Sequence, residues 1–319
     1  MITIAWLLAF AGGTAVIVWG AEAFAEHLGA ASVRLGVSAF ALALLLAGAE
    51  PEELATVVVA ALRGSPGIAL GDVIGANVTI CLVALGIGAW ITELPFRRAV
   101  MRYALLGLPL GAIATCMAWN GRVGRGDGVV LVLLYAAYVG AIWFAERRPP
   151  ALGEVGELAE AREAAAKGKS GRVGPDLVMV LAGVLAMAGG ASLLVYAVQQ
   201  ISGAQAMQTR LGLTIVGFAT GFELVVLAWS AARRGISEAA VAGVVGSFAY
   251  NVTMTLGAGA LVRPLAIIDA ALLRLPLLMM LAALALVVLL SARRGTLGRA
   301  EALILLLGYP VFVVVSLVA

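Results

Sequence analysis

Charge is scarce in this sequence. Only 12% of its 319 residues are Asp, Glu, Lys or Arg, and 63% are hydrophobic. A soluble domain averages about 25% charged and 45–50% apolar residues, so this composition excludes an ordinary soluble protein. The charges lie in short clusters between apolar runs of about 20 residues, the length at which a helix spans a bilayer. Because no alternating ten-residue pattern occurs, the sequence does not favour a β-barrel.

Residues for enzymatic chemistry are equally scarce. His27 is the only histidine, and there is neither an HExxH motif nor a GxxxxGK[ST] motif. Cys81 and Cys116 both lie in apolar runs, where we expect buried thiols rather than a disulfide or a metal pair. The net charge is only +3, with basic residues scattered over the loops, so no nucleic-acid partner is indicated. We therefore expect neither an enzyme nor a resident cofactor.

The apolar runs predict an all-α polytopic membrane protein with ten spanning helices. The N-terminal run has no basic residue before it and is interpreted as a retained helix. The ten segments are predicted at about 3–24, 35–62, 67–92, 99–119, 127–145, 176–200, 211–232, 237–261, 265–292 and 300–318.

One long connection, 147–175, divides the chain into two five-helix halves, 1–146 and 176–319. Five is an odd number, so the halves enter the membrane from opposite sides and form an inverted repeat. The second and seventh helices are predicted to be interrupted near Gly48–Pro51 and Gly217–Gly221.

The distribution of Lys and Arg predicts the orientation. With the N-terminus outside, 15 of the 21 basic residues are cytoplasmic and 5 are external, and Arg274 lies within the ninth segment. We expect the plasma (inner) membrane of a prokaryote, with both termini outside, and no obligatory protein partner beyond the lipid bilayer.

Two stretches of the chain repeat each other, Leu44–Ile80 and Val216–Asn251. Each contains an apolar run broken by Gly and an acid, then a helix ending in Arg-Gly, then a Gly-rich apolar run. One constant shift along the chain superposes Glu52 on Glu223, Arg63 on Arg234, Gly64 on Gly235 and Gly75 on Gly246. We interpret the two stretches as the centres of the two halves.

Carboxylates in these stretches are the candidate functional groups. Glu50, Glu52 and Glu53 flank Pro51 between apolar segments, and three acids this close in low dielectric would share protons or hold a cation. The alternative is a surface loop with solvated acids. In the second stretch the candidate is Glu223, because a lone charge within hydrocarbon is costly and typical of an ion or proton site.

Uncharged and acidic side chains on the neighbouring helices complete the predicted cation site. Thr220 lies one turn before Glu223, where its hydroxyl either joins the site or bonds its own helix. The facing helices contribute Asp72, Asn77 and Thr79 from the first copy, and Ser247, Tyr250 and Asn251 from the second. Asp72 lies about two turns into its helix, so it is a candidate for an outer entrance rather than the centre.

The two stretches resemble the repeats of the cation/calcium exchanger superfamily, which includes sodium/calcium and proton/calcium exchangers. The family's repeats follow approximately the pattern G-[ST]-S-x-P-E, then an apolar helix that ends in R-G, then G-N-x-x-G-S-N. The first copy here reads GAEPEE, ELATVVVAALRG and GDVIGAN, and the second reads FATGFEL, VVLAWSAARRG and GSFAYN. The ten spans, the basic central loop and the external N-terminus resemble the family as well.

The resemblance implies an antiporter that exchanges Ca²⁺ or another divalent cation for H⁺ or Na⁺ at one midplane site. It assigns Glu223 as one binding glutamate and leaves the partner open between Glu52 and Glu53. Ala49 and Glu50 stand where the family has Thr and Ser, which favours proton coupling. The remaining alternatives are a non-transporting scaffold or sensor of the same fold and, with less support, an intramembrane enzyme.

Overall fold

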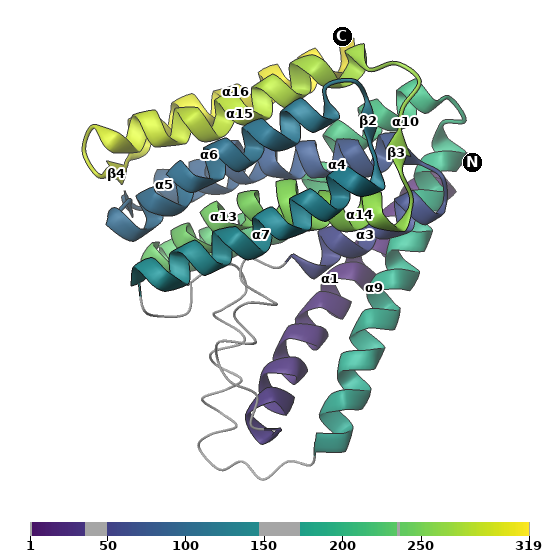
Figure 1. The fold of residues 1–319 in the computed structure, drawn as a ribbon, viewed down its shortest axis with the longest axis horizontal. Coiled ribbons are helices and arrows are strands. Elements are labelled where there is room, and N and C mark those ends of the chain that lie inside the picture. The colour runs from purple at the N-terminus through teal and green to yellow at the C-terminus, as the bar shows by residue number, and fades with distance from the viewer. Residues whose placement is uncertain (1, 36–49, 147–172, 235–236, 319) are drawn as a thin grey trace.

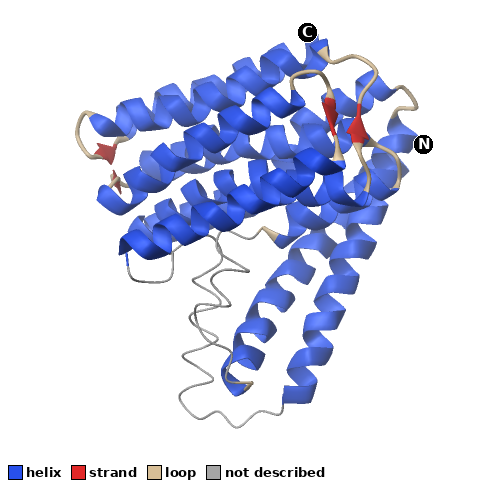
Figure 2. Cartoon of the chain, viewed as in Figure 1, coloured by secondary structure: helices blue, strands red, loops and turns tan. Residues whose placement is uncertain are grey.

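The computed structural model describes residues 2–35, 50–146, 173–234 and 237–318. Within these ranges the chain is almost entirely helical (Figure 2). Nine helical segments of this described part are long and apolar enough to cross a membrane. The predicted second span contributes a tenth segment, of which the part from residue 50 onward is described. The predicted all-α, ten-helix architecture is confirmed.

The first half of the chain runs from α1 to α7. Its helices and strands are α1 (Ile2–Arg34), α3 (Pro51–Leu62), α4 (Pro66–Thr79), the π-helix η1 (Ile80–Ala84), α5 (Leu85–Ile91), β1 (Leu94–Pro95), α6 (Arg98–Ala118), β2 (Arg122–Val123) and α7 (Arg125–Glu146).

The second half repeats this order. Its elements are α9 (Val173–Ile201), α10 (Gln205–Leu211), η2 (Gly212–Val216), α11 (Gly217–Thr220), α12 (Phe222–Arg234), α13 (Ser237–Tyr250), η3 (Asn251–Thr255), α14 (Leu256–Val262), β3 (Leu265–Ala266), α15 (Ala271–Ala292), β4 (Thr296–Leu297) and α16 (Arg299–Val318).

The predicted internal repeat is visible in the element boundaries. The starts of α3 and α12, of η1 and η3, and of α5 and α14 are separated by one and the same offset, which also relates Glu52 to Glu223. The ends of α4 and α13 follow this offset too. Even the rare π-helical turn recurs at the same place, so the repeat extends from sequence into backbone geometry.

Two small antiparallel strand pairs depart from a purely helical fold. Strand β1 pairs with β4, and β2 pairs with β3. The two pairs lie at opposite ends of the helical bundle (Figure 2). Each pair joins a loop of one half to a loop of the other half, so the two halves are tied together at both ends.

Helices α1 and α9 pack against each other and run at a steep angle to the remaining helices (Figure 1). They touch backbone to backbone at two glycine pairs, Gly13 with Gly190 and Gly20 with Gly183, because a residue without Cβ allows this approach. Near the other end of the pair, Asp176 of α9 contacts His27 (3.1 Å) and Arg34 of α1.

Helices α4 and α13 occupy the centre of the molecule. In α4 every residue after Pro66 is buried. The segment from α10 to α11 lies directly against it, because Gly71 and Gly75 expose bare backbone to Leu213 and Gly217. Gly71 and Gly75 thus allow close helix contact at this position.

Some predicted helix ends differ from the structure. Helix α1 continues to Arg34 instead of ending near residue 24, because the Ala-rich stretch after the apolar run is more polar but still helix-forming. The ninth span begins at Ala271 rather than near residue 265, because Leu265–Ala266 pairs with β2. Hydropathy thus located the spans. It did not show that α1 continues as helix beyond its apolar part, or that Leu265–Ala266 is apolar but not helical.

Two adjacent glycines provide a matched test of the α1–α9 contact. A Cβ at Gly13 would lie 2.8 Å from the Gly190 carbonyl oxygen, whereas one at Gly12 would meet nothing within 4 Å. We expect Gly13→Ala to lower the free energy of unfolding by about 1–3 kcal/mol through overpacking. Both substitutions gain the same helix propensity, so Gly12→Ala should be neutral or slightly stabilising. Equal melting temperatures for the two purified variants would refute this contact.

Candidate cation-binding site

The site is built on two short helices that begin inside the protein. Helix α12 starts at Phe222 after a one-residue break at Gly221, which confirms the predicted interruption of the seventh helix. Helix α3 starts at Pro51 after the non-helical Glu50, and the predicted break residues before Glu50 lie outside the described residues. The first-turn N–H groups of such helices lack helical partners and favour negative charge.

Each of these helices carries a glutamate at its second residue, Glu52 in α3 and Glu223 in α12. The two glutamates occupy equivalent positions, because the offset between the helix starts is also the offset between the glutamates. Glu53 has no acidic counterpart, since residue 224 is a leucine. The backbone therefore matches Glu52, rather than Glu53, to Glu223.

The acids of the first copy are deeply buried. Glu50, Glu52 and Glu53 each retain only 1% of their accessible surface, whereas Glu223 is partly buried. These side chains are not part of a solvated surface loop. Both Glu52 and Glu53 are enclosed by the protein, although adjacent helix positions project about 100° apart.

The buried acids are close enough to interact electrostatically across the two halves. Glu52 interacts with Glu223 and Glu50, and Glu53 interacts with Asp72, Glu52 and Glu223. Asp72 is therefore a neighbour of Glu53 and is fully buried, which does not fit the predicted outer entrance. The carboxylates form one cluster between the repeats.

Two hydroxyl groups connect the halves at this cluster. Ser247 of α13 donates to Glu50 Oε1, and Thr220 of α11 donates to Asp72 Oδ1 at 2.7 Å. Each bond joins an interrupted helix of one half to the facing helix of the other. The backbone carbonyls of Val216 and Gly243 also lie within reach of Thr220 and Ser247, so each hydroxyl hydrogen is shared between a carboxylate and its own helix.

Two asparagines lie on the facing helices and are fully buried. Asn77 donates its amide to the Val73 carbonyl at 2.8 Å, and its Oδ1 has no hydrogen-bond partner within the described structure. Asn251 lies beside Glu53 at the start of η3, and its Oδ1 accepts from Thr255 at 3.3 Å. Asn77 thus presents an uncommitted amide oxygen, a ligand type that hard cations accept.

Several acidic oxygens in this cluster are unsatisfied. Both carboxylate oxygens of Glu52 and of Glu53, and Oδ2 of Asp72, are buried without a hydrogen-bond partner in the described part of the chain. Buried polar atoms are almost always paired. Such a set can be stabilised by protons or by a bound cation.

The described acidic side chains do not by themselves form a metal-binding site. Among the described residues, no group of three or more His, Cys, Asp or Glu side chains is close enough to hold a metal ion. A hard cation here would need hydroxyl, amide and backbone oxygens to complete its coordination.

Two tyrosines lie beside the acids, Tyr250 from the predicted set and Tyr135 outside it. Tyr250 interacts electrostatically with Glu50, Glu52 and Glu53, and its ring meets that of Tyr135 edge-on at 5.3 Å between centroids. Tyr135 of α7 lies in an ordinary apolar run that carries no signal for a site residue.

Comparison with known proteins agrees with this architecture. The family described as "Sodium/calcium exchanger protein" matches residues 5–144 and 176–318. The chain belongs to this family. The resemblance inferred from the two repeats is confirmed, and the family is one of transporters rather than enzymes.

Individual members of the exchanger family are distant in sequence but similar in fold. The putative antiporter CaxA of Alkalimonas amylolytica is 25% identical over 93% of this chain and 94% of its own. The crystal structure of the H⁺/Ca²⁺ exchanger CAX is 17% identical with a TM-score of 0.73, covering 99% of this chain and 90% of that one. A structure of the sodium-calcium exchanger NCX_Mj is 21% identical with a TM-score of 0.60, covering 98% and 99%.

The bond between Thr220 and Asp72 gives a test of the exchanger site's structure. Thr220→Val keeps the side-chain shape but removes the donor, so Asp72 would lose its hydrogen bond in a buried position. We expect the free energy of unfolding to fall by about 1–3 kcal/mol. Thr220→Ser retains the hydroxyl and serves as the control. A Thr220→Val protein that melts at the same temperature as Thr220→Ser would contradict the bond.

Proposed function

We propose that the chain is a secondary active antiporter that exchanges a divalent cation, with Ca²⁺ as the first candidate, for H⁺ or Na⁺. The observation that carries this proposal is the pairing of Glu52 and Glu223, which begin two equivalent half-helices from opposite repeats and interact across the centre. The calcium exchange named for the structurally similar CAX and NCX_Mj proteins supports Ca²⁺ as the cargo.

Competition for the same carboxylates provides the coupling. A divalent cation needs ionised carboxylates, Glu52 and Glu223 above all, whereas protons bind the same oxygens and remove their charge. Cation and protons therefore exclude each other, and each crosses the membrane when the other returns. Alternating exposure of the site to the two sides, as inverted repeats allow, completes the cycle without a cofactor.

The hydroxyl groups favour protons over Na⁺ as the counter-ion. In this structure Ser247 and Thr220 donate to the acids Glu50 and Asp72. Ala49 and Glu50 replace the family's Thr and Ser, so fewer hydroxyl oxygens are available as Na⁺ ligands than in the family pattern. Surplus acids with few hydroxyls suit a proton-coupled exchanger.

We assign the protein to the plasma membrane of a prokaryotic cell, with its N-terminus outside. The distribution of basic residues favours this orientation, since six arginines flank the β1–β4 end of the bundle within residues 92–102 and 291–301. A non-transporting scaffold of the same fold is the second candidate, because the family's Thr and Ser ligands are absent at Ala49 and Glu50. Ion flux in proteoliposomes distinguishes the two.

The essential role of the carboxylates can be tested by amide substitution. Glu223→Gln keeps shape and hydrogen bonding but removes the charge, so we expect divalent-cation exchange in proteoliposomes to be abolished. Folding should be unchanged, because an amide is easier to bury than a carboxylate. Glu93→Gln, at an exposed acid, is the control and should exchange normally.

The same assay ranks the two adjacent glutamates. Because Glu52 is the positional equivalent of Glu223, we expect Glu52→Gln to be as severe as Glu223→Gln, and Glu53→Gln to be milder. A well-folded Glu223→Gln variant that exchanges at the wild-type rate would overturn the carboxylate mechanism.

Proton coupling predicts a particular pH dependence. As pH falls, protons occupy the carboxylates and exclude the cation, so cation binding should weaken on acidification and strengthen as pH rises. We expect the change to fall in the pH range over which protons and the cation compete, because both bind the same carboxylates. Exchange should follow an imposed pH gradient and depend weakly on Na⁺. Full activity driven by Na⁺ at clamped pH, without proton movement, would contradict proton coupling.

A further inference from the structure

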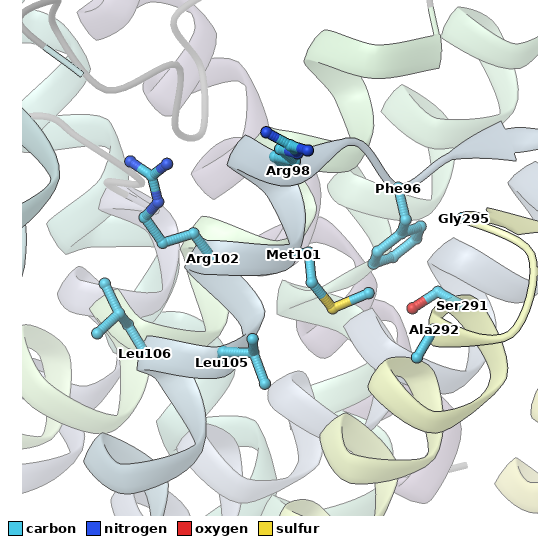
Figure 3. A pocket seen from close by; sticks show the side chains of 9 residues that line it. All are labelled: Phe96, Arg98, Met101, Arg102, Leu105, Leu106, Ser291, Ala292 and Gly295. Carbon is cyan, nitrogen blue, oxygen red and sulfur yellow. The ribbon is translucent and has the colours of Figure 1, made fainter. Parts of the chain in front are cut away.

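A second feature with the character of a binding site lies far from the carboxylates, at the end of the bundle held by β1 and β4. It is an open pocket of about 540 Å³ between the first turns of α6 and the last turn of α15 (Figure 3). The backbone N–H of Phe96 donates to the Gly295 carbonyl at 2.8 Å, which closes one side of the pocket. The transport proposed above does not involve it.

The pocket combines two kinds of lining. Arg98 and Arg102 are one helical turn apart and line the same pocket, and Met101, Leu105 and Phe96 supply an apolar wall (Figure 3). Leu105 is 50% exposed on the outer surface of α6. The pocket therefore places positive charge at the mouth of an apolar surface.

The surrounding charge favours an anionic occupant. Residues 92–102 and 291–301 contain six arginines and two glutamates. Helix α6 also begins here at Arg98, and its N-cap residue makes no side-chain capping bond, so its first N–H groups add to the positive field.

The inverted repeat argues that these arginines are not required by the fold. On the opposite face α15 is the equivalent of α6, and counted from the first residue of each helix it has Ala271 and Leu275 where α6 has Arg98 and Arg102. The nearby Arg274 lies over the ring of Trp119, 5.9 Å from its centroid. The helix therefore does not need arginines at these positions, and Arg98 and Arg102 lie at the end of the bundle that the distribution of basic residues assigns to the cytoplasm.

We propose that this pocket binds an anionic phospholipid. Its phosphate would pair with Arg98 and Arg102, since guanidinium groups bind phosphate in a bidentate fashion, and an acyl chain would follow Leu105 along the outside of α6. A spanning helix begins at this level, so the headgroup and the acyl chain of a bilayer lipid meet their matching surfaces. A water-soluble phosphate ester would use the arginines but leave the apolar wall unmatched.

The test is a lipid-binding titration of the purified full-length protein in detergent, followed by native mass spectrometry. Short-chain phosphatidylglycerol, phosphatidylcholine of the same chain length, and inorganic phosphate are the three probes. We expect phosphatidylglycerol to bind best, and Arg98→Gln/Arg102→Gln to weaken it roughly 30-fold, given the usual contribution of a basic residue near a lipid surface. Met101→Trp, which fills the pocket but keeps both charges, should also weaken it.

Arg122→Gln, an exposed arginine at the other end of the bundle, is the matched control for Arg98→Gln and should leave binding unchanged. The proposal fails if the double variant binds phosphatidylglycerol within threefold of wild type, or if Arg122→Gln weakens binding as much as Arg98→Gln. It also fails if phosphatidylcholine binds equally well. Inorganic phosphate binding as tightly as the lipid would reduce the site to a plain anion site and overturn the lipid assignment.

Discussion

The structure depends on the cost of burying carboxylates in a chain that otherwise avoids charge. Glu50, Glu52, Glu53 and Asp72 are all buried within an apolar bundle, where the neighbours described above are other acids, hydroxyls, amides and a phenol. Helix N-termini, two hydroxyls and neighbouring amides offset part of this cost. The buried carboxylate oxygens that still lack a partner in the described part of the chain can take up positive charge, and the repeat architecture holds them in one place.

Hydrogen bonds between the two halves hold two of the buried acids in place. Glu50 receives a hydrogen bond from α13, and Asp72 receives one from α11, so each of these two acids of the first half depends on a residue of the second. The elements are related by the repeat, but these residues are not: Gly221 corresponds to Glu50, and Gly243 corresponds to Asp72. Glu50 and Asp72 are therefore asymmetric additions to a frame in which Glu52 and Glu223 are equivalent.

Much of the frame could be predicted from sequence because hydropathy and the constant offset between the halves are both long-range patterns. Glu52, Glu223, Thr220 and Ser247 stood out because a polar group in an apolar run is visible without a structure. The burial of Asp72 beside Glu53 was not foreseen, because counting turns from a helix start gives no depth when the whole helix is buried. Tyr135 was missed because proximity to the acids comes from packing of α7, which no local pattern encodes.

The strand pairs between the two halves have a consequence for biogenesis. Strand β1 can pair only after Leu297 of β4 has been synthesised, so most of the second half is translated before this strand pair forms. At about 5–20 residues per second, translation of the intervening chain takes roughly 10–40 s. During much of that interval the acids of the first half are already in the chain but lack Ser247 and Thr220. Until the second half is made, the first half can form neither the β1–β4 pair nor the hydrogen bonds from Ser247 and Thr220 to its acids.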